Sequence, residues 1–196
     1  IRDRVNNVLT YTSGDLSLTG ATGVTHSAAG DLTTSGAGTI TVVSTANDVT
    51  MVDGTVFTAG GGSVSVTGAD EVLLGKIANP LGTVSVTATA GDISDETSAE
   101  GTSNENISGT TVTLSAASGV GATGAANDID TAATTIVAAD SSSGGIYISE
   151  TDGVAVGATS TTAGAISITA GGAVTTSGNI TAAGGALAIT CLLYTS

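Results

Sequence analysis

The acidic residues are the most reactive groups in this sequence, which contains 17 Asp and Glu but only 3 Lys and Arg. One group is Asp92, Asp95 and Glu96, and a second is Asp128 and Asp130. Paired carboxylates hydrolyse glycosidic bonds when one is the acid and the other is the base or nucleophile. Asp95 and Glu96 are adjacent and would face opposite sides of a strand, whereas Asp128 and Asp130 would share a side.

A polysaccharide-cleaving site usually also has a basic residue or aromatic rings that hold the sugar, and this sequence scatters both. Lys76 is the one basic residue outside the first four positions, and Tyr11, Phe57 and Tyr147 are far apart in the chain. We therefore interpret the carboxylates as solvated turn residues and predict that the chain is not an enzyme. A polysaccharide-acting enzyme is the alternative, and an activity lost when the second carboxylate pair is changed to Asn would favour it.

Calcium is the ligand that the carboxylates would suit best, because it prefers hard oxygen donors at turns. The glycine-rich nonapeptide of calcium-binding β-rolls and the EF-hand loop are both absent from the sequence. We predict no cofactor and no dedicated metal site, with weak calcium binding through Asp128, Asp130 and Asp140 as the one exception.

The single histidine, His26, lies close in sequence to Ser27 and Asp31, which are the residue types of a Ser-His-Asp triad. Nothing in their spacing orients the three side chains toward one another. We therefore predict an exposed turn position for His26 and no catalytic role.

The charge balance excludes two classes of partner. The formal net charge is −14, whereas proteins that bind nucleic acids or anionic membrane surfaces carry clusters of Lys and Arg. No run of apolar residues is long enough to predict a transmembrane helix. Cys191 is the only cysteine, so the sequence predicts neither a disulfide nor a cysteine-based metal site.

A short repeat of the form Gly-x-apolar-x-apolar-Ser/Thr supplies the elements that position these residues. Clear copies are GSVSVTG and GTVSVTA, in which apolar and hydroxyl residues alternate. Val64 and Val66 would face one side of a strand and Ser65 the other, which is typical of a half-buried strand. The first apolar residues of the copies are Leu16, Ile40, Val64, Val84, Val112, Ile146, Ile166 and Leu187.

These positions recur along the whole chain, with shorter copies and Gly, Asn or Asp turns between them. The pattern predicts an all-β, single-stranded parallel β-solenoid with rungs of about 20–24 residues, in which each coil buries its inner face against the next. The chirality of parallel crossovers favours a right-handed β-helix. A β-sandwich of antiparallel hairpins is the alternative, but it would favour larger core residues, more aromatics and no fixed period.

Two intervals between copies are longer than the rest, one from Val84 to Val112 and one from Val112 to Ile146, and both predict insertions. They contain the segments Ser94 to Gly109 and Gly119 to Gly145. The first segment is the most polar and acidic stretch, so we expect it to project from the rod as a loop. We also expect it to carry any specific binding, because insertions in solenoids map to loops on one face.

The two ends depart from the repeat pattern. Residues 1–4 (IRDR) and 191–196 (CLLYTS) look like translated adapter sequence rather than native protein. We interpret residues 5–190 as a repetitive β-helix segment of a larger protein.

The run from Asn127 to Gly157 carries a family resemblance, because an Asn-x-Ile-x-Thr stretch leads to a Gly-Gly-Ile-Tyr-Ile strand. It resembles a recurring segment of filamentous-haemagglutinin-type exoproteins and of autotransporter passenger domains, and Ala78 to Val84 is similar to the lead-in. The resemblance implies a right-handed β-helix, secretion across a Gram-negative outer membrane, and a role in adhesion or biofilms.

We accordingly expect a structural or adhesive segment of a large bacterial protein that is secreted or displayed on the outer cell surface. The expected partners are glycans or proteins of host or neighbouring cells, without nucleic acid or membrane insertion, and the open ends of the rod are expected to self-associate. A passive spacer without a ligand is an alternative. An ice-binding surface of Thr-x-Thr pairs, such as Thr39 with Thr41, is a weaker one.

Overall fold

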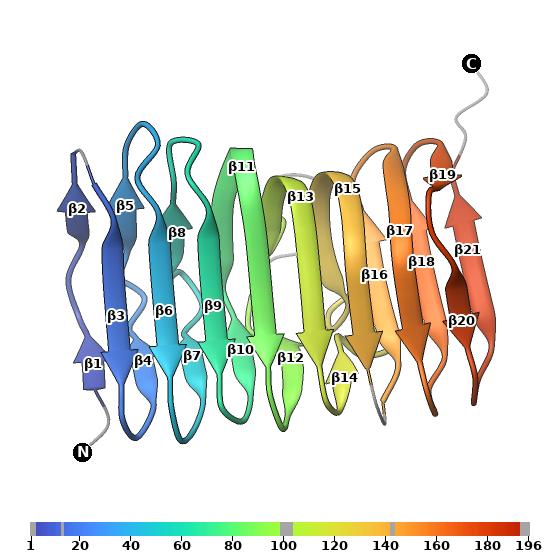
Figure 1. Ribbon diagram of the computed structural model, residues 1–196, viewed down its shortest axis with the longest axis horizontal. Coiled ribbons are helices and arrows are strands. Elements are labelled where there is room, and N and C mark those ends of the chain that lie inside the picture. The colour runs from blue at the N-terminus through green and yellow to red at the C-terminus, as the bar shows by residue number, and fades with distance from the viewer. Residues whose placement is uncertain (1–2, 13, 99–103, 142–143, 193–196) are drawn as a thin grey trace.

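The chain forms a parallel β-solenoid of about 8 turns (Figure 1). The structure is a computed structural model that describes residues 3–12, 14–98, 104–141 and 144–192. These residues form 21 strands and no helix, and every strand pair is parallel. Among the described residues, no helix is available that could cross a membrane.

The strands stack into three sides, which we call the first, second and third faces. The first face begins with β3 (Leu16–Gly20), β6 (Ile40–Ser44) and β9 (Val64–Gly68). The second face contains β1 (Asp3–Val5), β4 (Val24–His26), β7 (Val49–Met51), β10 (Val72–Leu74), β12 (Asp92–Asp95), β14 (Gly119–Val120), β16 (Ile146–Glu150), β18 (Ile166–Ala170) and β21 (Leu187–Cys191). The third face begins with β2 (Leu9–Tyr11), β5 (Leu32–Thr34) and β8 (Val56–Thr58).

Three long strands in the middle of the rod run from the third face around a corner into the first. They are β11 (Lys76–Ala88), β13 (Ile107–Ala116) and β15 (Ile129–Ser141). Beyond them, β17 (Val154–Thr161) pairs with β15, and β19 (Val174–Thr176) and β20 (Ile180–Ala182) pair with β17. The segment Ala78 to Val84, expected to be another copy of the lead-in, lies within β11.

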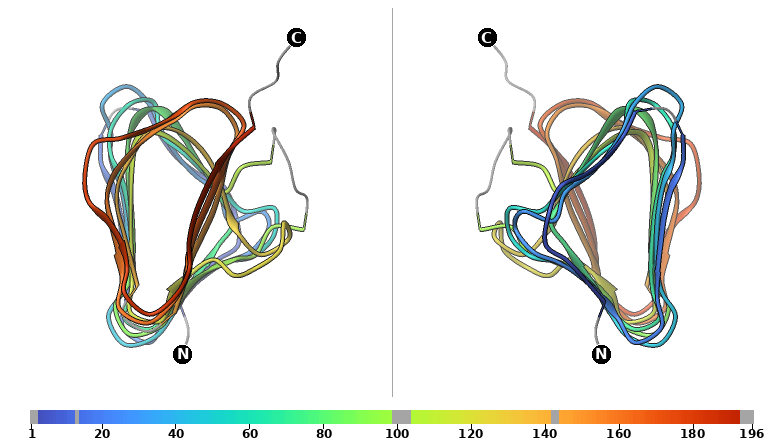
Figure 2. Two further views of the ribbon diagram at one scale, coloured as in Figure 1. Left: turned by 90° about the vertical axis from the view of Figure 1, so that its right-hand side faces the viewer. Right: turned by 90° about the vertical axis from the view of Figure 1, so that its left-hand side faces the viewer.

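The path of the chain is right-handed, as the sequence predicts. In Figure 1 the near strands β3, β6 and β9 run downward and the far strands β4 and β7 run upward, while the chain advances from left to right. Figure 2 looks along the axis and shows a roughly triangular coil. One side carries a projection in the blue-to-yellow coils that the orange and red coils lack.

Apolar side chains point inward and hydroxyl side chains point outward along each strand, as predicted. In β9, Val64 and Val66 are fully buried, and Ser65 between them is half-buried on the outside. Equivalent residues stack in columns from coil to coil. One inner column on the first face is Leu16, Ile40, Val64, Val84, Val112, Ile136 and Val156. An outer column mixes Thr41, Ser65, Ser85 and Thr113, so it is not a uniform threonine array.

A second inner column corrects the alignment of the repeats that the sequence predicts. Ile146, Ile166 and Leu187 were expected to continue the column of Leu16, but they lie on the second face. Their column is Val24, Val49, Val72, Ile93, Val120, Ile146, Ile166 and Leu187. The long interval before Ile146 is therefore a change of face, because the repeat motif occurs on both faces. Within each face the spacing is ordinary, since Val112 pairs with Ile136 and Val120 pairs with Ile146.

Coil length varies along the rod. The longest interval between paired residues on the first face separates Val84 from Val112. The coils from Ile146 to Ile166 and from Ile166 to Leu187 are among the shortest. The insertion expected before Val112 is therefore confirmed, although it is confined to residues between β12 and β13.

The two ends of the rod expose side chains that would face inward in a middle coil. Leu9 pairs with Leu32 but is 45% exposed, and Leu187 pairs with Ile166 but is 50% exposed. Strand β1 includes Arg4 and β21 includes Cys191, so each end segment expected to be foreign contributes to a strand. Residues 1–2 and 193–196 lie outside the described residues, and the boundaries at 5 and 190 stay a prediction.

Candidate ligand-binding face

The corner between the second and third faces is where the coils differ most in length. We number the coils from the one that contains β4. In the second coil this corner comprises residues 52–55, between β7 and β8; in the third it is Gly75 alone, between β10 and β11; and in the fourth it comprises residues 96–106, between β12 and β13. The strands on either side stay in register, since Leu74 pairs with Asp95 and Ile77 with Ile107. The short third corner lies between two long ones. The difference in length leaves a hollow in the side of the rod.

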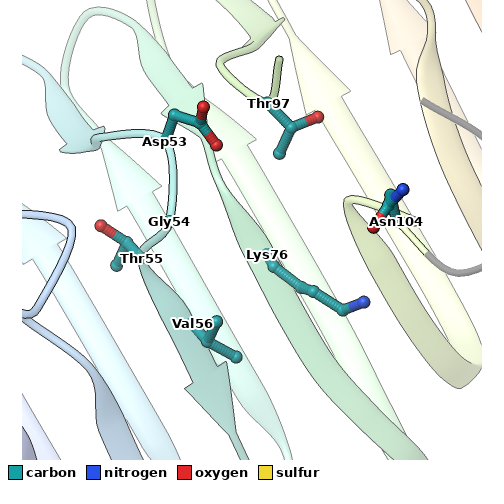
Figure 3. Close-up of a pocket in the computed structure, with 7 residues that line it drawn as sticks. All are labelled: Asp53, Gly54, Thr55, Val56, Lys76, Thr97 and Asn104. Atoms are coloured by element: carbon teal, nitrogen blue, oxygen red, sulfur yellow. The ribbon is translucent and has the colours of Figure 1, made fainter. Parts of the chain in front are cut away.

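This first hollow has a volume of about 160 Å³ and is lined by Asp53, Gly54, Thr55, Val56, Lys76, Thr97 and Asn104. Figure 3 shows Lys76 between the turn at Asp53 to Val56 and Asn104. The Lys76 ammonium lies 3.7 Å from Glu105 Oε2. The Ser98 hydroxyl donates to Asp53 Oδ2 at 2.6 Å, so the fourth coil is tied across the third to the second.

Asp53 lines this hollow, and Glu105 lies close to it through its ion pair with Lys76. Burial raises the pKa of Glu96, and the negative charges of Glu71, Asp95 and Asp53 raise it further. Of the first predicted carboxylate group, Asp95 and Glu96 are half-buried and Asp92 is exposed. The face is therefore acidic and contains one lysine already paired with a glutamate.

A buried polar network lies beneath the insertion. Asp95 Oδ1 accepts hydrogen bonds from the Thr97 amide and hydroxyl, both at 2.7 Å, and from Asn106 Nδ2 at 2.6 Å. Asn106 is fully buried, and its Oδ1 accepts from the Asp130 amide at 2.8 Å. Asn106 therefore links the fourth coil to the fifth, and sequence reasoning missed it because a single Asn among polar loop residues forms no pattern.

The second predicted carboxylate pair lies next to this network. Burial raises the pKa of Asp128, and the charges of Asp130 and Asp95 raise it further. Buried oxygens of Asp95 and Asp128 have no hydrogen-bond partner among the described residues. The spacing of Asp128 and Asp130 in the sequence predicts that they lie close together. The proximity of Asp95 could be seen only in the folded structure, because Asp95 belongs to the preceding coil.

The predicted calcium ligands are only partly brought together. Asp130 lies at the beginning of β15, whereas Asp140 lies near its end, in register with Ser115 and Ser160 on the first face. The side chain of Asp140 lies outside the described residues. Within the part of the chain whose side chains are described, no group of three or more Asp, Glu, His or Cys residues has a geometry that would hold a metal ion.

A second loop leaves the rod one coil further on. Val120 pairs with Ile146, and Ile129 pairs with Ile148, so residues 121–128 lie opposite the single residue Tyr147. The loop is closed by hydrogen bonds from the Ala122 amide to the Asn127 carbonyl and from the Asn127 amide to the Gly124 carbonyl. Most of the predicted second insertion, Gly119 to Gly145, is instead strand, with residues 142–143 outside the described part.

Hollows lie on both sides of this loop. One, of about 180 Å³, is lined by Asp92, Ser94, Asp95, Gly121, Ala122 and Asn127. The other, of about 340 Å³, is lined by Ala122, Gly124, Ala125, Asp128, Tyr147, Ile148, Ser149, Ser167 and Thr169. Together with the hollow at Lys76, they follow one side of the rod from the second coil to the seventh.

The prediction that His26 occupies an exposed turn is wrong. His26 is fully buried on β4 and points inward, with its Nδ1 2.9 Å from the Gly30 carbonyl oxygen and its ring 4.8 Å from that of Phe57. Burial lowers the pKa of His26, whereas the hydrogen bond with Gly30 and the negative charge of Asp31 raise it by less. Its ring bonds to Gly30 rather than to Ser27, and Asp31 instead accepts from the Val56 amide. In the three-residue strand β4, side chains alternate between the two sides, so His26 points inward like Val24.

Glu150 is a second buried ionisable group, and its alternation with Ile146 and Ile148 is the sequence signal that places it on the inner side. It ends β16 facing inward, 3% exposed, where it accepts from the Thr131 hydroxyl at 2.6 Å and from the Ala133 amide at 3.1 Å. Burial raises the pKa of Glu150 to about 7, although these hydrogen bonds lower it.

The fold defines this chain as a repeat protein of the parallel β-solenoid class. No protein-family model, curated protein or solved structure matches it. The resemblance to filamentous-haemagglutinin-type exoproteins therefore stays a prediction from the texture of the sequence.

Proposed function

We propose that the chain is a structural and adhesive rod segment of a large bacterial protein that is secreted or displayed on the outer cell surface. The observation that carries this proposal is the concentration of length variation at one corner of an otherwise regular rod. Inner columns and backbone pairing hold the other sides in register, so loops of different length can change on this corner without disturbing the core. Regular scaffolds with one variable side are typical of binding proteins.

We propose glycans or proteins of host or neighbouring cells as the partners. The net charge of −14 and the acidic hollows argue against nucleic acids and anionic membrane surfaces. We further propose that the chain is not an enzyme and needs no cofactor, with calcium as at most a weak ligand. Support comes from the burial of His26, which keeps the one imidazole away from any substrate.

The adhesive proposal is tested with beads that carry the full chain, in flow over surfaces coated with neutral, sialylated or sulfated glycans and with matrix proteins. Beads carrying an unrelated acidic protein of equal charge are the control. We expect retention on at least one surface above the control. Retention no higher than that of the control beads on every surface would favour a passive spacer. Release of reducing sugar from a coated polysaccharide would favour the enzyme alternative.

We also propose that this segment, when isolated from the larger protein, associates head to tail through its rod ends. Each end presents unpaired strand edges together with apolar residues, namely Val8, Leu9 and Tyr11 at one end and Leu187, Ile189 and Leu192 at the other. Because the two surfaces differ, their contact would repeat without closing and would give filaments. Light scattering should show particles that grow with concentration. A monomer at all concentrations would contradict this.

A further inference from the structure

The hollow beside Tyr147 has the composition of a sugar-binding site. Its floor is formed by outward side chains of two neighbouring strands on the second face, Tyr147 and Ser149 of β16 and Ser167 and Thr169 of β18. All four are half-buried. Ligand sites typically combine a concave surface with a few fixed polar groups, and this hollow combines an aromatic ring with hydroxyl groups.

The strand register fixes these four side chains in a grid. Tyr147 pairs with Ser167, and Ser149 pairs with Thr169. Neighbouring strands lie about 4.8 Å apart, and residues two apart on a strand lie about 6.6 Å apart on the same side. The pairing of the backbone therefore holds the hydroxyls in place before any ligand arrives.

The Tyr147 ring is packed against the strand and is not a free surface side chain. A Cβ atom added at Gly145 would lie 2.5 Å from Tyr147 Cε2 and 2.9 Å from Cζ, so the ring lies over this glycine. Any other residue at position 145 would displace the ring. The ring thus has a defined position at low entropic cost, which suits an aromatic binding platform.

The loop of residues 121–128 supplies the wall of the hollow and its one charge. It leaves the second face at Gly121, where φ is +62° and an added Cβ would lie 2.6 Å from the Tyr147 carbonyl oxygen. It returns at Asp128, which lines the hollow and has a buried oxygen without a hydrogen-bond partner among the described residues. Glycine at position 121 therefore permits the loop that brings a carboxylate next to the aromatic ring.

We propose that this hollow binds a neutral glycan chain, with one pyranose against Tyr147. The apolar C–H face of the sugar would pack on the ring, and its hydroxyls would donate to Asp128 and exchange hydrogen bonds with Ser149, Ser167 and Thr169. The hollow contains no cation among its lining residues, and the chain carries a net charge of −14, so sulfated and sialylated glycans are disfavoured. The inference rests on the proposed adhesive function and names its ligand class.

The first test is ¹⁹F NMR of the full chain labelled with 3-fluorotyrosine, with the Tyr147 signal assigned by Tyr147→Phe. Cello-, xylo-, malto- and laminaritetraose are the neutral probes, and a heparin tetrasaccharide is the sulfated probe. We expect the Tyr147 signal to shift saturably with at least one neutral probe, without a shift at Tyr11. A shift with the heparin fragment alone, or with no probe, would overturn the inference.

The second test measures the Kd of the best neutral probe by calorimetry, with circular dichroism to verify the fold of each variant. Tyr147→Ala should weaken binding at least about tenfold, whereas Tyr147→Phe should keep it within about threefold. Asp128→Asn should also weaken binding, because a neutral amide accepts sugar hydroxyls less strongly. Ser65→Ala, on the outer side of β9 and away from the hollow, is the control and should leave the Kd unchanged.

The two proposals fail separately. If coated beads adhere to a glycan or protein surface and Tyr147→Ala adheres equally, the adhesive function stands and the site is overturned. If wild-type beads adhere to no surface, the adhesive function fails, whatever the tetrasaccharides do in solution.

Discussion

The first and last coils of the rod use the same columns of paired residues but enclose different interiors. Early coils are long, such as the one that joins Val24 to its partner Val49, and they contain Phe57, Leu32 and Met51 fully buried. Late coils, such as the one that joins Ile146 to Ile166, are shorter, and their interior is built mainly from Ile, Val and Ala. Coil circumference and side-chain volume therefore differ together between the two ends of the rod.

The two interiors also bury opposite ionisable groups. His26 lies inside the early coils against Phe57, and Glu150 lies inside the late coils against Thr131. The pKa of His26 is lowered and that of Glu150 is raised, so each group is favoured in its neutral form. A solenoid behaves as a row of neighbouring units, so the two halves can respond separately to mutation and pH.

Phe57→Ala should have the largest effect. The long early coil cannot shrink without losing its strand register, so the cavity would remain and cost about 3–5 kcal/mol. Native-state hydrogen exchange of residues 16–74 would measure the loss. Ile168→Val in a late coil is the control, with a cost of about 0.5–1.5 kcal/mol. If the two substitutions destabilised the protein equally, the early interior would have closed around the smaller side chain, and Phe57 would not be what keeps it wide.

Glu150 should make the late coils less stable as the pH rises. Its folded pKa of about 7 lies above the ordinary value of 4.5, so its contribution is complete below pH 4.5 and is lost as the pH rises through 7. The difference corresponds to about 3 kcal/mol. Hydrogen exchange of residues 146–170 at pH 5 and pH 8, corrected for intrinsic rates, would measure it. Glu150→Gln should abolish the dependence, and a dependence unchanged in that variant would refute its origin.

His26 should give the early coils the opposite dependence. Its folded pKa lies below the ordinary 6.5, so the unfolded chain takes up a proton first and stability is lost as the pH falls below 6.5. Exchange of residues 24–58 at pH 7.5 and pH 5.5 would reveal the loss. His26→Leu should remove it. A loss of protection in the late coils instead would mean that the halves unfold together.

Outward hydroxyl residues should matter least, in both halves. Ser65→Ala in an early coil and Thr175→Ala in a late coil should each change stability by no more than about 0.5 kcal/mol, because both side chains remain in contact with water. Urea denaturation followed by circular dichroism is sufficient. A larger loss of stability in one half would show that the early and late coils differ in their outer surfaces as well as in their interiors.

Much of the fold followed from local pattern. Alternation around Val64 predicted which side chains are inward, and the Gly, Asn and Asp turns predicted short strands on successive sides. Alternation cannot tell one face from another, however, because the same motif serves both. For that reason the column predicted for Ile146 is wrong and the insertion predicted before it is too long. Within the candidate site, the proximity of Asp128 and Asp130 was predictable from their spacing, whereas the contribution of Asp95 was not.

The sequence by itself determined the class of structure, because period-2 alternation of small apolar and hydroxyl residues can bury its inner face only by stacking on a copy of itself. Tertiary structure alone decided which residues became neighbours across coils. Tyr147 lies beside Ser167 and Thr169 because strand register brings together residues that a full coil separates in the chain. His26 lies beside Phe57 because their side chains point inward from two different faces and meet in the interior. That register depends on the length of every corner, which the packing of the interior sets and no local pattern specifies.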